Sequence, residues 1–174
     1  MVDTATFDAF ISAVDCIALE AIDVIRNGDC SEETQSKLEG AIPLYNACLH
    51  LEGLTKEMEA LVHNNRGAAR YYAGVAASKR LNAGGMDYDG HLFLESISDL
   101  VEAISCAPGM RLAKANQGAA YMALGQAFLA EETFKEALGM NGESIALDVL
   151  ANMARERIGM GIHSMPYFAG SKIG

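Results

Sequence analysis

Residues 111–141 of the chain read RLAKANQGAAYMALGQAFLAEETFKEALGMN, and this stretch decides the fold. The pattern predicts two helices that meet at Gly125. Gly118 and Tyr121 fall on one face of the first helix. One face of the second helix carries Ala130, Phe134 and Ala137. Small residues at such positions let two antiparallel helices approach closely, and the aromatic side chains fill the space between them.

The order of these residues resembles a tetratricopeptide repeat, in which a small residue and an aromatic precede a turn glycine, followed by alanine, aromatic and alanine. The closing proline of that repeat is absent, and Gly142 stands in its place. The resemblance implies an all-α fold of seven to nine helices, arranged as antiparallel hairpins that stack in a superhelix. It also implies that the first helix of each hairpin lines a concave groove.

A second copy of the pattern lies upstream. Residues 67–69, Gly74 and Ala76 match residues 118–120, Gly125 and Ala127 at an offset of 51 positions. The second helix, 91–106, matches at an offset of 34: Ser96, Leu100, Ala103 and Pro108 correspond to Ala130, Phe134, Ala137 and Gly142. We therefore expect a first helix over 66–83, followed by a long loop, 82–90. A slipped alignment that pairs Gly74 with Gly118 would shorten the insertion to ten residues.

Helical periodicity continues on both sides of these hairpins. Residues 4–27 predict an amphipathic helix that is capped at Asp3 or Thr4 and ends at Asn27-Gly28. The next helix begins at residues 29–31, and Pro43 either kinks it or splits it into 44–53 and a helix from Thr55. The sequence leaves both alternatives open. Residues 143–158 predict a closing helix, so we expect one helical domain over 1–160.

Residues 161–174 have no helical period and contain Pro166, which predicts a non-helical C-terminal tail. The tail is apolar between residues 163 and 173, with Lys172 as its one charge. Such a tail would either occupy the groove and compete with partners or cover the outer face of the last helix, and the sequence does not decide between the two.

Composition narrows the classes of function. The formal net charge of −10 disfavours binding to a phosphate backbone, so we expect no nucleic-acid partner. No apolar run is long enough for a membrane span, and the acidic N-terminal residues do not resemble a secretory signal, so we predict a cytoplasmic protein. The four cysteines form no CxxC pair. We expect them to be reduced thiols that mostly fill the core.

No residue pattern predicts catalysis or a cofactor. The sequence contains no GxSxG, P-loop, GxGxxG or HExxH motif. Glu59 and His63 lie one helical turn apart, but no second such pair accompanies them. Asp87, Asp89 and His91 alternate in a glycine-rich loop and could hold a cation, which leaves a metal-dependent sensor or enzyme as an alternative.

Basic and amide side chains beside aromatic and methionine residues predict a site for a protein partner on the first helices. The predicted groove consists of Asn64, Asn65, Arg70, Tyr71, Arg111, Lys114 and Met122. By resemblance to peptide-binding tetratricopeptide proteins, these residues would hold a peptide or helix of another protein, an acidic one included. We therefore expect an adaptor, scaffold or chaperone rather than an enzyme. The remaining alternative is a self-assembling structural protein, with the groove filled by a second copy.

Overall fold

A computed structural model describes residues 3–84 and 90–140, and every regular element in these ranges is an α-helix. The helices are α1 (Thr4–Arg26), α2 (Glu32–Leu49), α3 (Lys56–Gly84), α4 (His91–Cys106), α5 (Arg111–Ala123) and α6 (Ala127–Gly139). The all-α prediction is therefore confirmed. The predicted closing helix 143–158, the tail 161–174 and most of the loop 82–90 lie outside the described residues, so a total of seven to nine helices stays a prediction.

The first two helices begin and end as the sequence predicts. The Asp3 carboxylate accepts a hydrogen bond from the Thr6 amide at 2.9 Å and so caps α1. Gly28 has a φ of 101°, which is favourable only for glycine, and it ends the helix. Ser31 caps α2 through the amide of Thr34.

The structure decides between the two alternatives at Pro43 and moves one predicted boundary. Helix α2 continues through Pro43, so the split at this proline is wrong. Helix α3 is a single helix that begins at Lys56. We expected the first helix of the upstream hairpin to begin at Arg66, so this helix begins ten residues earlier than predicted. The pair Asn64-Asn65 does not interrupt this helix, because Asn65 donates to the Asp15 carboxylate of α1 instead of to its own backbone.

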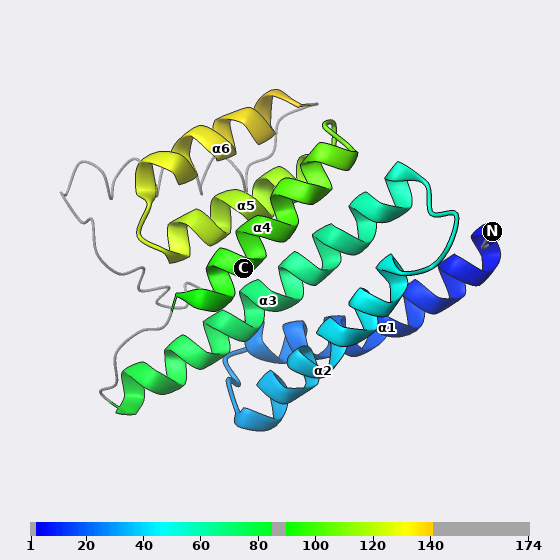
Figure 1. Ribbon diagram of the computed structural model, residues 1–174. Helices are drawn as coiled ribbons and strands as arrows, with labels where there is room; N and C mark the ends of the chain where they lie inside the picture. The colour runs from blue at the N-terminus through cyan, green and yellow to red at the C-terminus, as the bar shows by residue number, and fades with distance from the viewer. Residues whose placement is uncertain (1–2, 85–89, 141–174) are drawn as a thin grey trace. The chain divides into compact units, whose positions relative to one another are not determined.

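The described residues divide into two compact units, one that ends at Pro108 and holds α1–α4, and one that begins at Gly109 and holds α5 and α6. In the first unit, α3 packs against α1, α2 and α4 (Figure 1). The expectation of a single domain over 1–160 stays a prediction.

Contacts between named residues give the directions of the helices in the first unit. Helices α3 and α4 are antiparallel, because a Cβ at Gly67 would lie 3.0 Å from Leu100 and a Cβ at Gly74 would lie 3.0 Å from Phe93. Helices α1 and α3 instead run in the same direction. Asp15 contacts Asn65 near the middle of both helices, and Arg26 contacts Tyr72 further along both.

The two core clusters explain why these helices pack. In the first unit, the apolar residues of α1 at helical spacing, from Phe7 to Ile25, pack on Leu38 and Tyr45 of α2 and on the alanines of α3. In the second unit, the core consists of Met122, Ala130, Phe134 and Ala137. A Cβ at Gly118 would lie only 2.6 Å from the Phe134 ring, so glycine is needed for the close approach of α5 and α6.

The pairing of Gly67 with Leu100 repeats the pairing of Gly118 with Phe134. These are the equivalences that the offsets of 51 and 34 predict, so the structure favours this alignment over the slipped one. No helix within the described ranges has both the length and the apolar character needed to cross a bilayer.

Candidate protein-binding groove

A hollow of about 150 Å³ opens between the parallel helices α1 and α3 of the first unit. It is lined by Asp15, Ala18, Leu19, Ile22, Tyr45, Asn65 and Ala68. We call this feature the α1–α3 groove. Its volume equals that of about five water molecules, which is room for one long side chain. Leu19 is 56% exposed although it is a large apolar residue, so one wall of the groove offers apolar surface to solvent.

Asp15 is the one charged residue in the lining, and neutral groups hold its carboxylate in place. The Tyr45 hydroxyl donates to Oδ1 at 2.7 Å. The Asn65 amide donates to Oδ1 at 2.9 Å and to Oδ2 at 3.0 Å. Burial, followed by the hydrogen bond to Asp15, raises the pKa of Tyr45, so the hydroxyl stays a donor. In the described part of the chain, no cation lies within ion-pair distance of Asp15.

The predicted residues Asn64 and Asn65 belong to this polar arrangement. Asn64 is only 2% exposed, and its amide donates to the Asn65 side chain at 2.9 Å. The buried Asn64 therefore positions the side chain of Asn65, and Asn65 itself lines the groove. The structure thus places one of the two predicted asparagines on the groove surface and the other in the interior.

An aromatic cluster lies further along α3 and includes a residue of α4. Tyr71 makes edge-on ring contacts with Tyr72 at 5.1 Å and with Phe93 at 5.6 Å between ring centres. The Arg26 guanidinium of α1 donates from Nε to the Tyr72 hydroxyl at 2.8 Å. Tyr71, predicted to face a partner, is half-buried in this cluster and packs toward α4 through Phe93.

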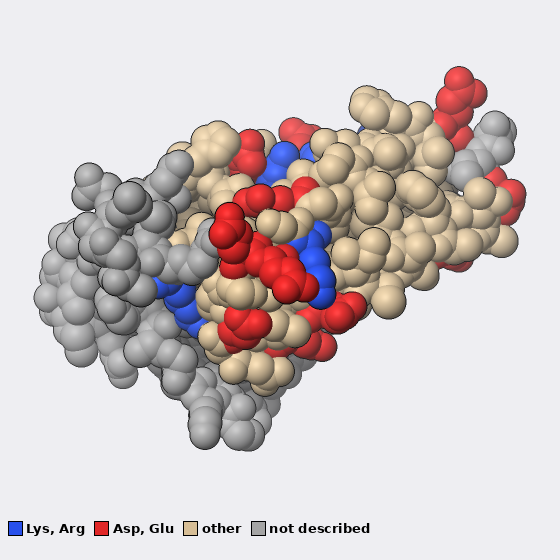
Figure 2. Space-filling view, turned by 90° about the horizontal axis from the view of Figure 1, so that it is seen from below, with Lys and Arg blue, Asp and Glu red and all other residues tan. Residues whose placement is uncertain are grey.

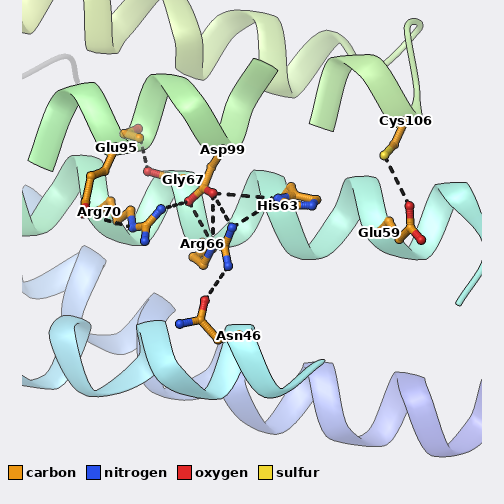
Figure 3. A network of polar contacts seen from close by, with 10 residues as sticks. Asn46, Glu59, His63, Arg66, Gly67, Arg70, Glu95, Asp99 and Cys106 are labelled. Atoms are coloured by element: carbon orange, nitrogen blue, oxygen red, sulfur yellow. Dashed lines mark hydrogen bonds and ion pairs between the residues drawn. The ribbon is translucent and has the colours of Figure 1, made fainter. Parts of the chain in front are cut away.

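Arg70 is engaged in an ion network between α3 and α4 (Figure 3). Asp99 of α4 is 3% exposed and points toward α3, where Arg66 approaches to 2.5 Å and Arg70 to 2.7 Å. His63 lies 3.8 Å from the same carboxylate. Arg66 also donates to Asn46 of α2, and Arg70 lies 3.4 Å from Glu95.

The electrostatic balance at Asp99 favours its charged form. Burial by itself would raise the pKa of Asp99, but the hydrogen bonds from His63 and Arg66, together with the charges of Arg66 and Arg70, lower it overall. Arg70, which the sequence placed in the partner groove, and its neighbour Arg66 therefore already bind a carboxylate of the chain. In the first unit, little basic charge near the groove is left for an acidic partner.

The second unit holds the other three predicted groove residues. Met122 is 1% exposed and belongs to the core around Phe134. Lys114 forms a 2.6 Å ion pair with Glu136 of α6, and its side chain is 18% exposed. Arg111 is half-buried at the first position of α5. The predicted site therefore divides between two units that we describe separately.

The described residues do not test the alternative metal site. Asp87 and Asp89 lie outside them, and His91 is exposed at the start of α4, 3.7 Å from Glu95. Within the described ranges no group of three or more His, Cys, Asp or Glu side chains could hold a metal ion.

Glu59 and His63 make their direct contacts with different partners, Lys56 and Asp99. Glu59 binds Lys56 at 2.5 Å, and this hydrogen bond lowers the pKa of Glu59. The Cys106 thiol donates to Glu59 at 3.5 Å, and burial followed by this bond raises the pKa of Cys106, which keeps the thiol protonated (Figure 3). All four cysteines are free. Cys48 lies in the core and Cys30 packs against it, whereas Cys106 is half-buried and Cys16 is exposed, so the expectation that they fill the core holds for two of the four.

Sequence reasoning missed Asp15, Leu19 and Tyr45. Asp15 and Leu19 lie beside the buried stripe of α1. The sequence pattern of α1 alone does not distinguish them from solvent-exposed residues. The signal that could have found Asp15 is its place beside Val14 and Ala18 on the edge of the apolar face. No family model and no curated protein matches this sequence.

Proposed function

We propose that the chain is a protein-binding adaptor, scaffold or chaperone, and that the α1–α3 groove holds a peptide or helix of a partner protein. The observation that carries this proposal is the open hollow beside the exposed side chain of Leu19, between two helices that run in the same direction. Exposed apolar surface next to a hollow of side-chain size is typical of a site where a partner inserts an apolar anchor.

The proposed architecture is a tetratricopeptide-like superhelix. Its support is the repeated geometry of the two hairpins: glycine meets a large apolar side chain in each, at Gly67 and at Gly118. The parallel course of α1 and α3 is a second support, because successive first helices of stacked hairpins run in the same direction. Cytoplasmic location and the absence of catalysis stay predictions that accompany this proposal.

The test uses a display library of random 16-residue peptides, selected on the full chain. We expect captured peptides that lose about tenfold in affinity when Leu19 is changed to Ser, because an apolar wall of the groove is removed. The matched control is Leu94→Ser on α4, which is also 56% exposed and lies outside the groove. Equal binding by both variants would move the site elsewhere, and a library without enriched peptides would overturn the proposed function.

Self-assembly is the second candidate, and a specific surface favours it. Phe10 and Ile17 of α1 and Leu44 of α2 are 38%, 42% and 37% exposed. They lie on the α1–α2 hairpin, whose helices are antiparallel, since Glu20 contacts Lys37 and Asp15 contacts Tyr45. If this surface drives assembly, light scattering will show a mass that rises with concentration and falls to that of a monomer for Ile17→Asp. A concentration-independent monomer would remove this candidate.

A further inference from the structure

We infer that the α1–α3 groove selects a lysine or arginine side chain of its protein partner, with Asp15 as the residue that determines specificity. This inference rests on the proposed function of the groove and names the chemistry of its partner. It also differs from the acidic partner that the sequence indicates, because that expectation depends on basic residues that do not line this groove.

The first step is the charge of the groove. Its seven lining residues include one formal charge, the Asp15 carboxylate, and no basic residue. Two neutral side chains donate hydrogen bonds to this carboxylate, and neither neutralises it. A carboxylate has about four acceptor positions, so it retains capacity for a further donor. A cation is the donor that also compensates the charge.

The charge of the whole chain strengthens this preference. The formal net charge is −10, and Figure 2 shows acidic side chains gathered on one face of the molecule. Near the groove, the basic residues of α3 are already paired: Arg66 and Arg70 hold Asp99. A long-range field of this sign attracts cationic segments and repels acidic ones.

The second step is the shape of the groove. Leu19, Ile22, Ala18 and Ala68 provide its apolar lining, and Asp15 provides its polar part. Lysine and arginine combine an aliphatic stem with a charged head, and they bury the stem while the head meets a polar group. The hollow of about 150 Å³ has room for one such side chain. An aspartate or glutamate would bring a like charge to Asp15, and a leucine would leave the carboxylate without a counter-charge.

The third step is the rigidity of the anchor. Tyr45 is 1% exposed, and its hydroxyl fixes one oxygen of Asp15 from below. Asn65 contacts both oxygens and is itself held by the buried Asn64. A carboxylate fixed by three contacts loses little conformational freedom on binding, which favours affinity.

The experiment begins with the best peptide from the display library. We expect the captured peptides to be enriched in lysine or arginine next to apolar residues. A synthetic version in which norleucine replaces the central cation keeps the aliphatic stem and removes the charge. On the unmodified protein we expect it to bind at least about tenfold more weakly, as the loss of a charge-assisted hydrogen bond predicts. This measurement does not depend on the folding of any variant.

The protein variants complete the test. Asp15→Asn should weaken the cationic peptide at least about tenfold and leave the norleucine peptide within twofold. Asp8→Asn removes the same charge from the exposed surface of α1 and should change neither affinity. Circular dichroism compares the folding of both variants.

The outcomes separate the two proposals. Peptides that depend on Leu19 but bind Asp15→Asn as tightly as the unmodified protein would overturn the cation preference and leave the groove function intact. Enrichment of aspartate and glutamate in the captured peptides would also overturn the cation preference, and it would indicate an acidic partner. If no peptide is enriched, both proposals fail together.

Discussion

The close packing of α5 on α6 predicts that alanine at Gly118 destabilises the protein, whereas alanine at another helical glycine stabilises it. A Cβ at Gly118 would lie 2.6, 2.7 and 2.9 Å from three carbons of the Phe134 ring. The best separation between carbons is about 3.5–4.0 Å, so the ring must move by roughly 1 Å. Phe134 has no exposed surface, so its ring would have to move within the core.

The magnitude follows from two opposing terms. Replacing glycine by alanine inside a helix gains roughly 1 kcal/mol of helix propensity. Overpacking a filled core costs typically about 1–3 kcal/mol. Gly40 provides the matched control, since it is also helical and a Cβ there meets nothing within 4 Å. We therefore expect the free energy of unfolding of Gly40→Ala to exceed that of Gly118→Ala by about 1–3 kcal/mol.

Urea unfolding followed by circular dichroism measures this difference. Gly67→Ala should fall between the two, because its nearest contacts, with Leu100 and Asp99, are 3.0 and 3.2 Å. Adding Phe134→Leu to Gly118→Ala should recover part of the loss, a coupling of at least about 1 kcal/mol in a double-mutant cycle. If Gly118→Ala stabilises the protein as much as Gly40→Ala does, the close approach of the two helices is refuted.

Two further predictions concern the first unit. Asp99→Asn should lower the free energy of unfolding by roughly 3–5 kcal/mol at neutral pH, because Arg66 would keep a buried charge without a counter-charge and Arg70 would retain only Glu95. Since the pKa of Asp99 is lower in the folded protein than its unfolded value of about 3.9, its contribution is present above roughly pH 4 and is lost as the pH falls through the folded value. The difference between the unmodified protein and Asp99→Asn in urea unfolding should therefore shrink on acidification, and a pH-independent difference would contradict this role. Pro43→Ala should stabilise the protein by about 1–3 kcal/mol, because Pro43 is exposed inside a continuous α2 and lacks an amide hydrogen. An unchanged unfolding midpoint would contradict a continuous helix at this residue.

The hairpins could be predicted from the sequence because they depend on local spacing. Gly118 and Phe134 are recognisable from residue size and helical period alone, and their equivalents Gly67 and Leu100 follow from the two offsets. The course of α2 through Pro43 could not be predicted. A proline inside a helix costs about 3 kcal/mol locally, and only the burial of Ala41 and Tyr45 on either side of it shows why the helix continues.

The candidate groove was harder to predict, because it depends on which helices are neighbours. Asp15 and Asn65 are 50 positions apart, and only the parallel packing of α1 and α3 brings them together. The exposure of Leu19 depends in the same way on what covers α1. A sequence read one helix at a time treats both residues as ordinary members of an amphipathic surface.

The repeat alignment also shows which positions of the other hairpin correspond to Arg66 of α3 and Asp99 of α4. The offsets of 51 and 34 make Arg66 equivalent to Gln117 and Asp99 equivalent to Thr133. Both equivalents in the second unit are buried and neutral, with exposed fractions of 6% and 7%. The α3–α4 hairpin therefore carries opposite charges at the two positions where the α5–α6 hairpin carries an amide and a hydroxyl.

A buried ion pair adds little net stability over a neutral pair, but a hairpin that slips by one turn would leave its charges unpaired. The charges at Arg66 and Asp99 thus disfavour other registers of α3 on α4. The connection between these two helices is longer than a short turn, and it therefore constrains their register less. This requirement is consistent with the position of Arg66 and Arg70, which contact Asp99 and do not line the groove. The carboxylate of Asp15, which has no such partner among the described residues, is the one charged group that lines the α1–α3 groove.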